Sequence, residues 1–362
     1  MNHSRIRDIR PTNRNGARDR DIMPREPFVS LVTPVYNTEP YLGACIKSVL
    51  HQTFQNWEYI IVDNCSTDSS PSIARAFALM DSRIRVVEAD KFRPQVGNYN
   101  FALRQISGVS DYCKIVQADD WLYPECLDQM LKVAEENPSV GIVGAYSLLD
   151  FGSHTSVFFT GLPCPGSITD GREACASFLR GRNVLFGNPT STLIRSEIVR
   201  SRDPFYCERS IIEDVEVCFD ILRSWDFGFV HQVLTYTRRH NESLMSEFRK
   251  YDLAKLADLI TIRKYGATFL EEKEYKKRRR QIEQEYRRIL GRSVLRMRSK
   301  AFWEFQKRAL EPLGDKLYWH KVGGYAFFAL VNMALNLLGN PKATLGSILR
   351  YLSRKSTKAC RP

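Results

Sequence analysis

The alternation of short apolar runs with helical segments is the feature that most constrains this chain. Between residues 28 and 117, the runs FVSLVT, YIIVD, IRVVE and YCKIVQ are rich in β-branched residues and read as strands. Helices are expected between and after them, at 39–52, 69–79, 96–106 and 124–135. Thr38 is a candidate N-cap for the first helix, and Pro71 suits the opening turn of the second. The pattern predicts βαβ units and an α/β fold with a mostly parallel sheet, in which ligands bind beyond the carboxyl ends of the strands.

The rest of the chain divides into three regions. Residues 1–26 lack periodicity and are rich in Arg, Asn and Asp, so we expect a disordered basic leader that is no secretory signal. The α/β domain is expected to run over 27–248, with a strand at 140–149, an extended or looped stretch at 153–166, helices at 172–180 and 215–223, and strands at 190–195 and 227–237. Residues 249–362 are expected to be helical, because Ile282, Tyr286, Ile289 and Leu290 recur at helical spacing.

The net charge of +12 conceals a partition between these regions. Residues 249–362 hold 27 Lys and Arg against 10 acidic residues, a net charge of +17, whereas residues 27–248 hold 19 against 27, a net charge of −8. An acidic body with a basic tail predicts that the two meet different partners.

Cysteine usage indicates a reducing compartment. The chain has nine cysteines, an odd number without any CxxC pair, and several of them lie in apolar runs where a free thiol packs as a small hydrophobe. We therefore expect a cytoplasmic location.

Polar motifs follow the predicted strands. They are TPVYN at 33–37, VDNCSTD at 62–68 and QADDW at 117–121, and IIEDVEVCF at 211–219 places Glu213 and Asp214 at the start of a helix. Asp119 and Asp120 are adjacent carboxylates that repel each other unless a cation lies between them, which suits a hard divalent ion. The alternative is a helix N-cap or a solvated turn. An ion with few protein ligands commonly bridges to phosphate oxygens, which suggests a nucleotide diphosphate.

These motifs, with VGNYNFALRQISG at 96–108 and in this order and spacing, resemble the family 2 glycosyltransferases over residues 27–243, about 60% of the chain. The resemblance implies an inverting, nucleotide-sugar-dependent enzyme of the Rossmann-like GT-A fold. It implies that the loop with Pro34, Tyr36 and Asn37 cups the nucleotide. Asp63 matches the family's first strand-end acid. Asn64 stands where the family usually has an Asp that contacts uracil, and Cys65 stands where it usually has Gly, so the base is left open.

The resemblance also implies the catalytic roles. Asp120 would coordinate Mn²⁺ or Mg²⁺, with Asp119 on the ribose or on a metal-bound water, and Asp214 would be the catalytic base. His240 matches a His or Arg near the diphosphate and is a candidate metal ligand, or else an exposed loop histidine beside Arg238 and Arg239, which themselves either clamp phosphate oxygens or are solvated. Gln95 and Asn98 would line the donor cleft, although Asn98 could instead cap the following helix. Residues 188–195 resemble the acceptor-side loop.

The basic tail predicts contact with an anionic membrane surface. Residues 276–280 are five consecutive cations, and residues 322–341 hold no charge. Asn332 and Asn336 share one helical face, which favours a helix lying in the interface over one that crosses it. The alternative is a solvated helix face packed on the catalytic domain. Nucleic acid is not expected as a partner, because no nucleic-acid-binding motif accompanies the charge.

Together these observations predict transfer of a single sugar, since the QxxRW motif of processive relatives is absent from the sequence. The expected donor is a nucleotide sugar, with UDP the favoured carrier, and the expected acceptor is a hydroxyl of a lipid-linked or cell-surface glycan. We expect the enzyme on the cytoplasmic face of the inner membrane. Two alternatives stay open: a polyprenyl-phosphate sugar synthase, and a non-catalytic scaffold, which only Asn64 and Cys65 support.

Overall fold

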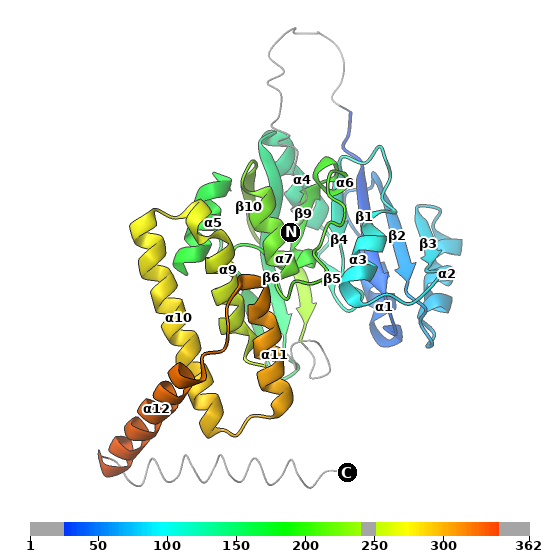
Figure 1. The fold of residues 1–362 in the computed structure, drawn as a ribbon. Helices are drawn as coiled ribbons and strands as arrows, with labels where there is room; N and C mark the ends of the chain where they lie inside the picture. Colours follow the sequence, from blue (N-terminus) through cyan, green and yellow to red (C-terminus); the bar gives the residue numbers. More distant parts are fainter. Residues whose placement is uncertain (1–24, 240–250, 340–362) are drawn as a thin grey trace. The chain divides into compact units, whose positions relative to one another are not determined.

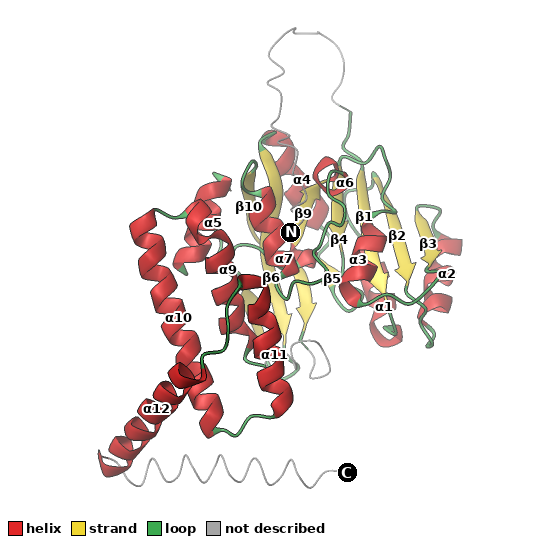
Figure 2. Cartoon of the chain, in the orientation of Figure 1, coloured by secondary structure: helices red, strands yellow, loops and turns green. Residues whose placement is uncertain are grey.

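A computed structural model describes residues 25–239 and 251–339 (Figure 1). The chain divides into two compact units, one running to residue 245 and including residues 268–270, and the other formed by residues 246–267 and 271–362. The first unit is a mixed α/β structure and the second is helical (Figure 2).

One sheet organises the first unit. Its strands lie in the order β3-β2-β1-β4-β9-β6-β10-β5, with β7 paired to β6 and β8 paired to β10. The strands are β1 Val29–Val35, β2 Trp57–Asp63, β3 Ile84–Glu88, β4 Tyr112–Ile115, β5 Trp121–Leu122, β6 Val140–Asp150, β7 Thr155–Phe158, β8 Ile168–Thr169, β9 Thr192–Arg195 and β10 Asp226–Arg238.

The sheet is mostly parallel, as predicted. Strand β1 pairs in parallel with β2 and β4, β2 with β3, and β6 with β10, whereas β9 is antiparallel to both β4 and β6. Val35 lies opposite Asp63, and Asp63 opposite Glu88, so the carboxyl ends of β1, β2 and β3 finish level with one another. This edge gathers the polar motifs that follow the strands.

The first helix of this unit buries one apolar face. In α1 (Glu39–Leu50), Leu42, Cys45, Ile46 and Val49 are buried at helical spacing. The other helices of this unit are α2 Ser70–Met80, α3 Gln95–Leu103, α4 Cys126–Glu136, α5 Gly171–Arg180, the 3₁₀ turn η1 Pro189–Ser191, α6 Ser196–Arg200 and α7 Glu213–Ile221. The predicted helices are confirmed to within a few residues, and Pro71 lies in the first turn of α2. Thr38 occupies the N-cap position of α1, as predicted, and its side chain makes no capping hydrogen bond there.

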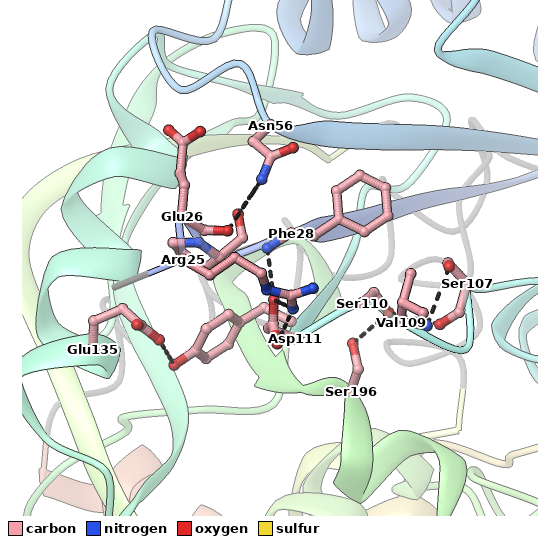
Figure 3. Close-up of polar contacts among 12 residues, drawn as sticks. Arg25, Glu26, Phe28, Asn56, Ser107, Val109, Ser110, Asp111, Glu135 and Ser196 are labelled. Carbon is pink, nitrogen blue, oxygen red and sulfur yellow. Dashed lines mark hydrogen bonds and ion pairs between the residues drawn. The ribbon is translucent and has the colours of Figure 1, made fainter. Parts of the chain in front are cut away.

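A polar cluster closes the opposite, amino-terminal edge of the sheet (Figure 3). Asp111, just before β4, accepts the backbone N–H of Phe28 at 2.8 Å and pairs with Arg25 at 2.7 Å. Asn56, just before β2, donates to the carbonyl oxygen of Glu26 at 3.2 Å. These contacts hold the start of β1 in place between its two neighbours.

The described part of the second unit consists of α10 Glu272–Leu295, α11 Lys300–Leu310, the 3₁₀ turn η2 Glu311–Leu313, α12 Trp319–Gly339 and most of α9 Leu253–Phe269. Ile282, Tyr286 and Leu290 are buried along one face of α10, as their spacing predicts. At Gly291 the helices α10 and α12 approach so closely that a Cβ would lie 2.7 Å from the carbonyl carbon of Tyr325. Within the described ranges, no helix combines the length and the apolar character that crossing a membrane requires.

Candidate active site

The turn after β1 is tied to the turn after β2. Tyr36 is 47% exposed at the end of β1, while Pro34 lies within the strand opposite Val62. Asn37 adopts a positive φ of 49°, which asparagine tolerates better than most residues. Its Oδ1 accepts the N–H of Thr67 at 2.8 Å and its own N–H donates to Ser66 Oγ at 3.0 Å. The two turns therefore form one continuous rim.

Asp63 ends β2 with one carboxylate oxygen unsatisfied. The side chain is 5% exposed, and Oδ2 accepts the N–H of Ser66 at 3.1 Å. Oδ1 is buried and has no hydrogen-bond partner among the described residues. A buried acceptor left in this state is costly and suits a donor supplied by a ligand.

Asn64 holds a neighbouring loop. Its Nδ2 donates to the carbonyl oxygen of Arg93 at 2.7 Å, and its Oδ1 accepts the N–H of the same residue at 2.9 Å. A carboxylate here could make only the second of these bonds, because it has no donor when ionised. Asn64, which stands where an Asp was expected, therefore positions the loop after β3 through its side-chain N–H and its side-chain oxygen.

The donor-cleft candidates lie on α3. Gln95 is exposed in its first turn, and Asn98 is 4% exposed in its interior. The N-cap of this helix is Pro94, so the alternative capping role of Asn98 is wrong. The Oδ1 of Asn98 is a second buried acceptor without a partner in the described ranges.

Asp120 follows β4 in the chain, and its carboxylate is surrounded by uncharged hydrogen-bond donors. It is 2% exposed, and its Oδ2 accepts the hydroxyls of Thr190 at 2.7 Å and Thr237 at 3.3 Å. Its Oδ1 accepts the N–H of Arg238 at 3.1 Å. Burial and the neighbouring Asp119 raise the pKa of Asp120 well above its ordinary value. The pair is an unfavourable concentration of negative charge that a cation would relieve.

Asp214 begins α7 as predicted. Its Oδ1 accepts the N–H of Val215 at 2.8 Å, and burial followed by repulsion from Glu213 raises its pKa to about 7. Gly187 passes close by with φ 127°, a conformation that favours glycine, and a Cβ there would lie 3.9 Å from Asp214 Oδ2. This carboxylate is therefore poised to exchange a proton near neutral pH.

Arg239 brings positive charge near both acidic sites. It is half-buried, and desolvation lowers its pKa against the opposing influence of Asp120, Asp119 and Asp214. Arg238 is packed rather than solvated: its guanidinium carbon lies 4.8 Å from the centre of the Tyr41 ring and 5.5 Å from that of Trp121. The positive charge of Arg239 partly offsets the raised pKa values of Asp120 and Asp214.

Asp119 and Asp120 are suited to a divalent cation whose coordination is completed by a bound ligand. Asp120 receives three donors on oxygens that together offer about four acceptor positions, so one position is left for an ion. No group of three His, Cys, Asp or Glu side chains suited to a metal occurs in the described ranges. Mg²⁺ is commonly held by one or two carboxylates with phosphates and waters. The candidate ligand His240 lies outside the described residues.

Sequence reasoning missed the residues that hold Asp120. Thr190 lies in η1, where Asn188 Oδ1 accepts its N–H at 3.0 Å, and Asn188 Nδ2 donates to Thr237 Oγ1 at 2.9 Å. Lys114 in β4 is fully buried and donates to the carbonyl oxygens of Thr190 at 2.9 Å and Thr192 at 3.2 Å. Residues 188–195, expected on the acceptor side, thus also support Asp120, the carboxylate that is expected to hold a metal. The Asn-Pro turn was their only signal in the sequence.

Comparison with known proteins gives consistent matches. The model of the family described as "Glycosyl transferase family 2" matches residues 30–199. "Glycosyltransferase GlyG" of Streptococcus pneumoniae serotype 4 is 25% identical over 248 residues, which cover 65% of this chain and 78% of GlyG. "Glycosyltransferase GlyA" of the same organism is 33% identical over 118 residues, 33% of this chain but 16% of GlyA.

Solved structures share the fold. TarS of S. aureus, residues 1–349, determined in complex with UDP-GlcNAc, superposes with a TM-score of 0.52 at 16% identity, over 71% of each chain. The complex of the same TarS segment with UDP gives a TM-score of 0.50 at 17% identity, over 71% of this chain and 70% of TarS. At this identity the likeness establishes the architecture.

Proposed function

Because this chain belongs to the family 2 glycosyltransferases, as its motifs predicted, and is a glycosyltransferase of the GT-A fold, we propose that it moves one sugar from a nucleotide-sugar donor to a hydroxyl group with inversion at the anomeric carbon. The proposed acceptor is a lipid-linked or cell-surface glycan, and the reaction is proposed to need Mn²⁺ or Mg²⁺. The observation that carries the proposal is the buried carboxylate of Asp120, which follows β4 and is held by the hydroxyls of Thr190 and Thr237 and by the N–H of Arg238.

The donor is proposed to lie along the rim formed by the turns after β1 and β2. Pro34, Tyr36 and Asn37 would border the nucleoside, and Asp63 Oδ1 would accept a hydrogen bond from it. Gln95 and Asn98 would line the cleft from α3, and Asp119 would approach the ribose. TarS binds UDP-GlcNAc on a similar fold, so UDP-sugars are the first donors to test.

Asp120, with His240 as a further candidate, would hold the cation, which when bound supplies a positive charge to the departing diphosphate. Asp214 would accept the proton of the acceptor hydroxyl as that oxygen attacks the anomeric carbon. Arg239 would keep both carboxylates oriented and add positive charge beside the phosphates. A single displacement inverts the anomeric carbon, so no covalent nucleophile is required.

The test measures sugar transfer from UDP-sugars to a glycan acceptor with Mn²⁺, with EDTA, and in the variants Asp120→Ala and Asp214→Asn. We expect EDTA and each variant to reduce transfer by two orders of magnitude or more. Glu173→Gln is the matched control, because Glu173 is an exposed acid in the first turn of α5 and is expected to be dispensable. Full activity under all three treatments would contradict the proposal.

Two further outcomes separate the alternatives. Full activity of Asp214→Asn toward a polyprenyl phosphate would favour the polyprenyl-phosphate synthase, because an acceptor that is already anionic needs no base. Binding of a nucleotide without turnover on any acceptor would favour the scaffold. Thermal shifts with a panel of nucleotides and Mn²⁺ would identify the base, since a ligand that binds the folded state raises Tm according to its affinity.

A further inference from the structure

Helix α12 exposes a continuous apolar face. Val322 and Ala326 are buried, whereas Phe327 and Phe328 are 69% and 57% exposed, and Leu335 is 59% exposed. The first three residues of α12, Trp319, His320 and Lys321, are also exposed. At 3.6 residues per turn, the exposed residues between Val322 and Leu335 whose side chains are described fall within an arc of roughly 160°. They are Gly323, Gly324, Phe327, Phe328, Leu330, Val331, Ala334 and Leu335. From Val322 to Gly339 the helix carries no charged residue. Exposure of this apolar face to water is therefore unfavourable.

Helix α10 exposes a stripe of cations. Lys273, Lys277, Arg280, Arg288 and Arg292 are all exposed and are spaced by four, three, eight and four residues. This spacing places them within roughly 120° of one another around the helix. Exposed polar Gln284 fills the gap in the stripe, and the half-buried Glu274 lies at the edge of the same arc. We call these five residues the cation stripe.

The apolar face and the cation stripe belong to one packed element. Helices α10 and α12 touch at Gly291, whose missing Cβ would lie 2.8 Å from the backbone nitrogen of Ala326. Gly291 is followed directly by Arg292 of the stripe, and Ala326 directly precedes Phe327 of the apolar face. The two features are therefore held next to each other where the helices cross.

We propose that α12 lies in the surface of an anionic lipid bilayer, with its apolar face among the acyl chains and the cation stripe of α10 against the headgroups. A partner must match both a charge-free apolar arc and an adjoining row of cations, and an anionic lipid surface offers both. Nucleic acid would match only the cations, and a second copy of this basic chain would bring like charges together. The proposal deepens the proposed function by naming the surface at which a lipid-linked acceptor is met.

Cosedimentation of the full chain with vesicles tests the proposal without using sugar transfer. We expect binding to vesicles of phosphatidylglycerol and phosphatidylcholine, and little binding to phosphatidylcholine alone. Replacing Phe327 and Phe328 together by Ser is expected to weaken the partition coefficient by roughly tenfold or more. Replacing Arg288 and Arg292 together by Gln is expected to weaken it by roughly 20-fold at low salt, and by less as salt is added.

Matched controls lie on the first unit. Leu79 and Met80 of α2 are 90% and 77% exposed, so their double replacement by Ser removes as many exposed apolar side chains and is expected to leave vesicle binding unchanged. The double variant Lys47→Gln and Lys132→Gln removes two exposed cations from the first unit and is likewise expected to leave vesicle binding unchanged. Transfer to a water-soluble acceptor is expected to be unchanged in all four variants, so loss of the membrane site and loss of the enzyme are distinguishable.

Four results would overturn the proposal. They are absence of binding to anionic vesicles, equal binding of the Phe327 and Phe328 variant, tighter retention on a DNA duplex than on vesicles, and a dimer in solution that the same Phe replacements dissociate. The last result would assign the apolar face to a second copy of the chain.

Discussion

Among the described residues, the fully buried charged side chains lie in the α/β unit, although both units carry ion pairs at their surface. In the α/β unit Asp120 and Lys114 are 2% and 0% exposed, and their described partners are hydroxyls, a backbone N–H and carbonyls. In the helical unit the cations of α10 face solvent, and the half-buried Glu283 is surrounded by Arg263, Arg279 and Arg287. Burial of a charged side chain opposes folding, so the first arrangement indicates a chemical use, whereas charges at the surface can be retained for their field alone.

The largest expected effect is at the buried base. Asp214→Asn is expected to lower kcat by roughly 10²–10⁴-fold, because it removes the proton acceptor and keeps the shape of the side chain. The same change is expected to stabilise the ligand-free protein at pH 8 by on the order of 1–4 kcal/mol. Denaturant unfolding at pH 5 and pH 8 measures the second effect. Loss of activity together with loss of stability at pH 8 would indicate a structural role instead.

The sign of that stability change follows from the raised pKa. Burial raises the pKa of Asp214 to about 7, so the folded protein binds this proton more tightly than the unfolded chain. The contribution to stability is therefore full below the ordinary carboxyl pKa and is lost as pH rises toward 7. Asp214→Asn abolishes this pH dependence.

The ionisation of Asp214 is also expected to appear in the pH dependence of the reaction rate. Because the base must be deprotonated to accept a proton, kcat/KM should rise about tenfold per pH unit below 7 and level off above it. Initial rates at subsaturating acceptor, from pH 5 to pH 9, measure the profile. A profile that is flat across neutral pH would exclude Asp214 as the base in the form described.

A smaller effect is expected at the hydrogen-bond donors around Asp120. Thr190→Val keeps the volume of the side chain but removes the 2.7 Å hydrogen bond to Asp120 and leaves the N–H of Gln117 without its acceptor. We expect Mn²⁺ affinity, measured by calorimetry with UDP present, to fall roughly tenfold. Thr192→Val is the control, because its hydroxyl donates to Pro189 at 3.1 Å and does not contact Asp120. Equal losses in both variants would mean that the hydroxyl only supports the fold.

In the helical unit the position expected to be most sensitive to substitution is an uncharged residue, Gly291. Gly291→Ala would place a Cβ 2.7 Å from the backbone of Tyr325, and we expect it to destabilise the packing of α10 on α12 by roughly 1–3 kcal/mol. Hydrogen exchange of α12 measures this loss. Gly323→Ala has no atom within 4 Å and is expected to be neutral or slightly stabilising. Unchanged exchange in Gly291→Ala would show that the contact is not needed.

The smallest effect is expected at a solvated cation. Lys276 pairs with Glu272 at 2.5 Å, but its side chain is 61% exposed, so Lys276→Gln should change the free energy of unfolding by less than about 0.5 kcal/mol. Glu283→Gln, which leaves three arginines without their shared partner, should cost more. Thermal unfolding of the two variants in one buffer compares them directly. Equal effects would remove the distinction between paired and solvated charges within this unit.

The contrast also explains what the sequence could predict. Regular patterns predicted regular elements: the β-branched runs became β1 to β4, and the helical spacing of Ile282, Tyr286 and Leu290 became the buried face of α10. The antiparallel insertion of β9 between β4 and β6 was not predictable, because pairing between distant strands leaves no local pattern.

Within the candidate site, the strand-end acids could be found because they interrupt apolar runs. The side chains that hold them could not. Thr190 is 70 residues from Asp120 and Thr237 is 117 residues away, and neither hydroxyl stands out among the chain's other threonines. The role of Asn64 was equally hidden, since its partner is a backbone group of Arg93 and has no sequence signature.

Asn64 has a counterpart in Asn100, whose amide takes both the N–H of Tyr206, at 2.8 Å, and its carbonyl oxygen, at 2.9 Å. Each asparagine imitates a peptide group and makes with a loop the paired bonds that one strand makes with another. The loops that contain Arg93 and Tyr206 are thus extensions of the hydrogen-bonded framework by side chain alone. An Asn-to-Asp change at either position would remove the donated bond of the pair and so loosen a loop without altering the loop's own sequence.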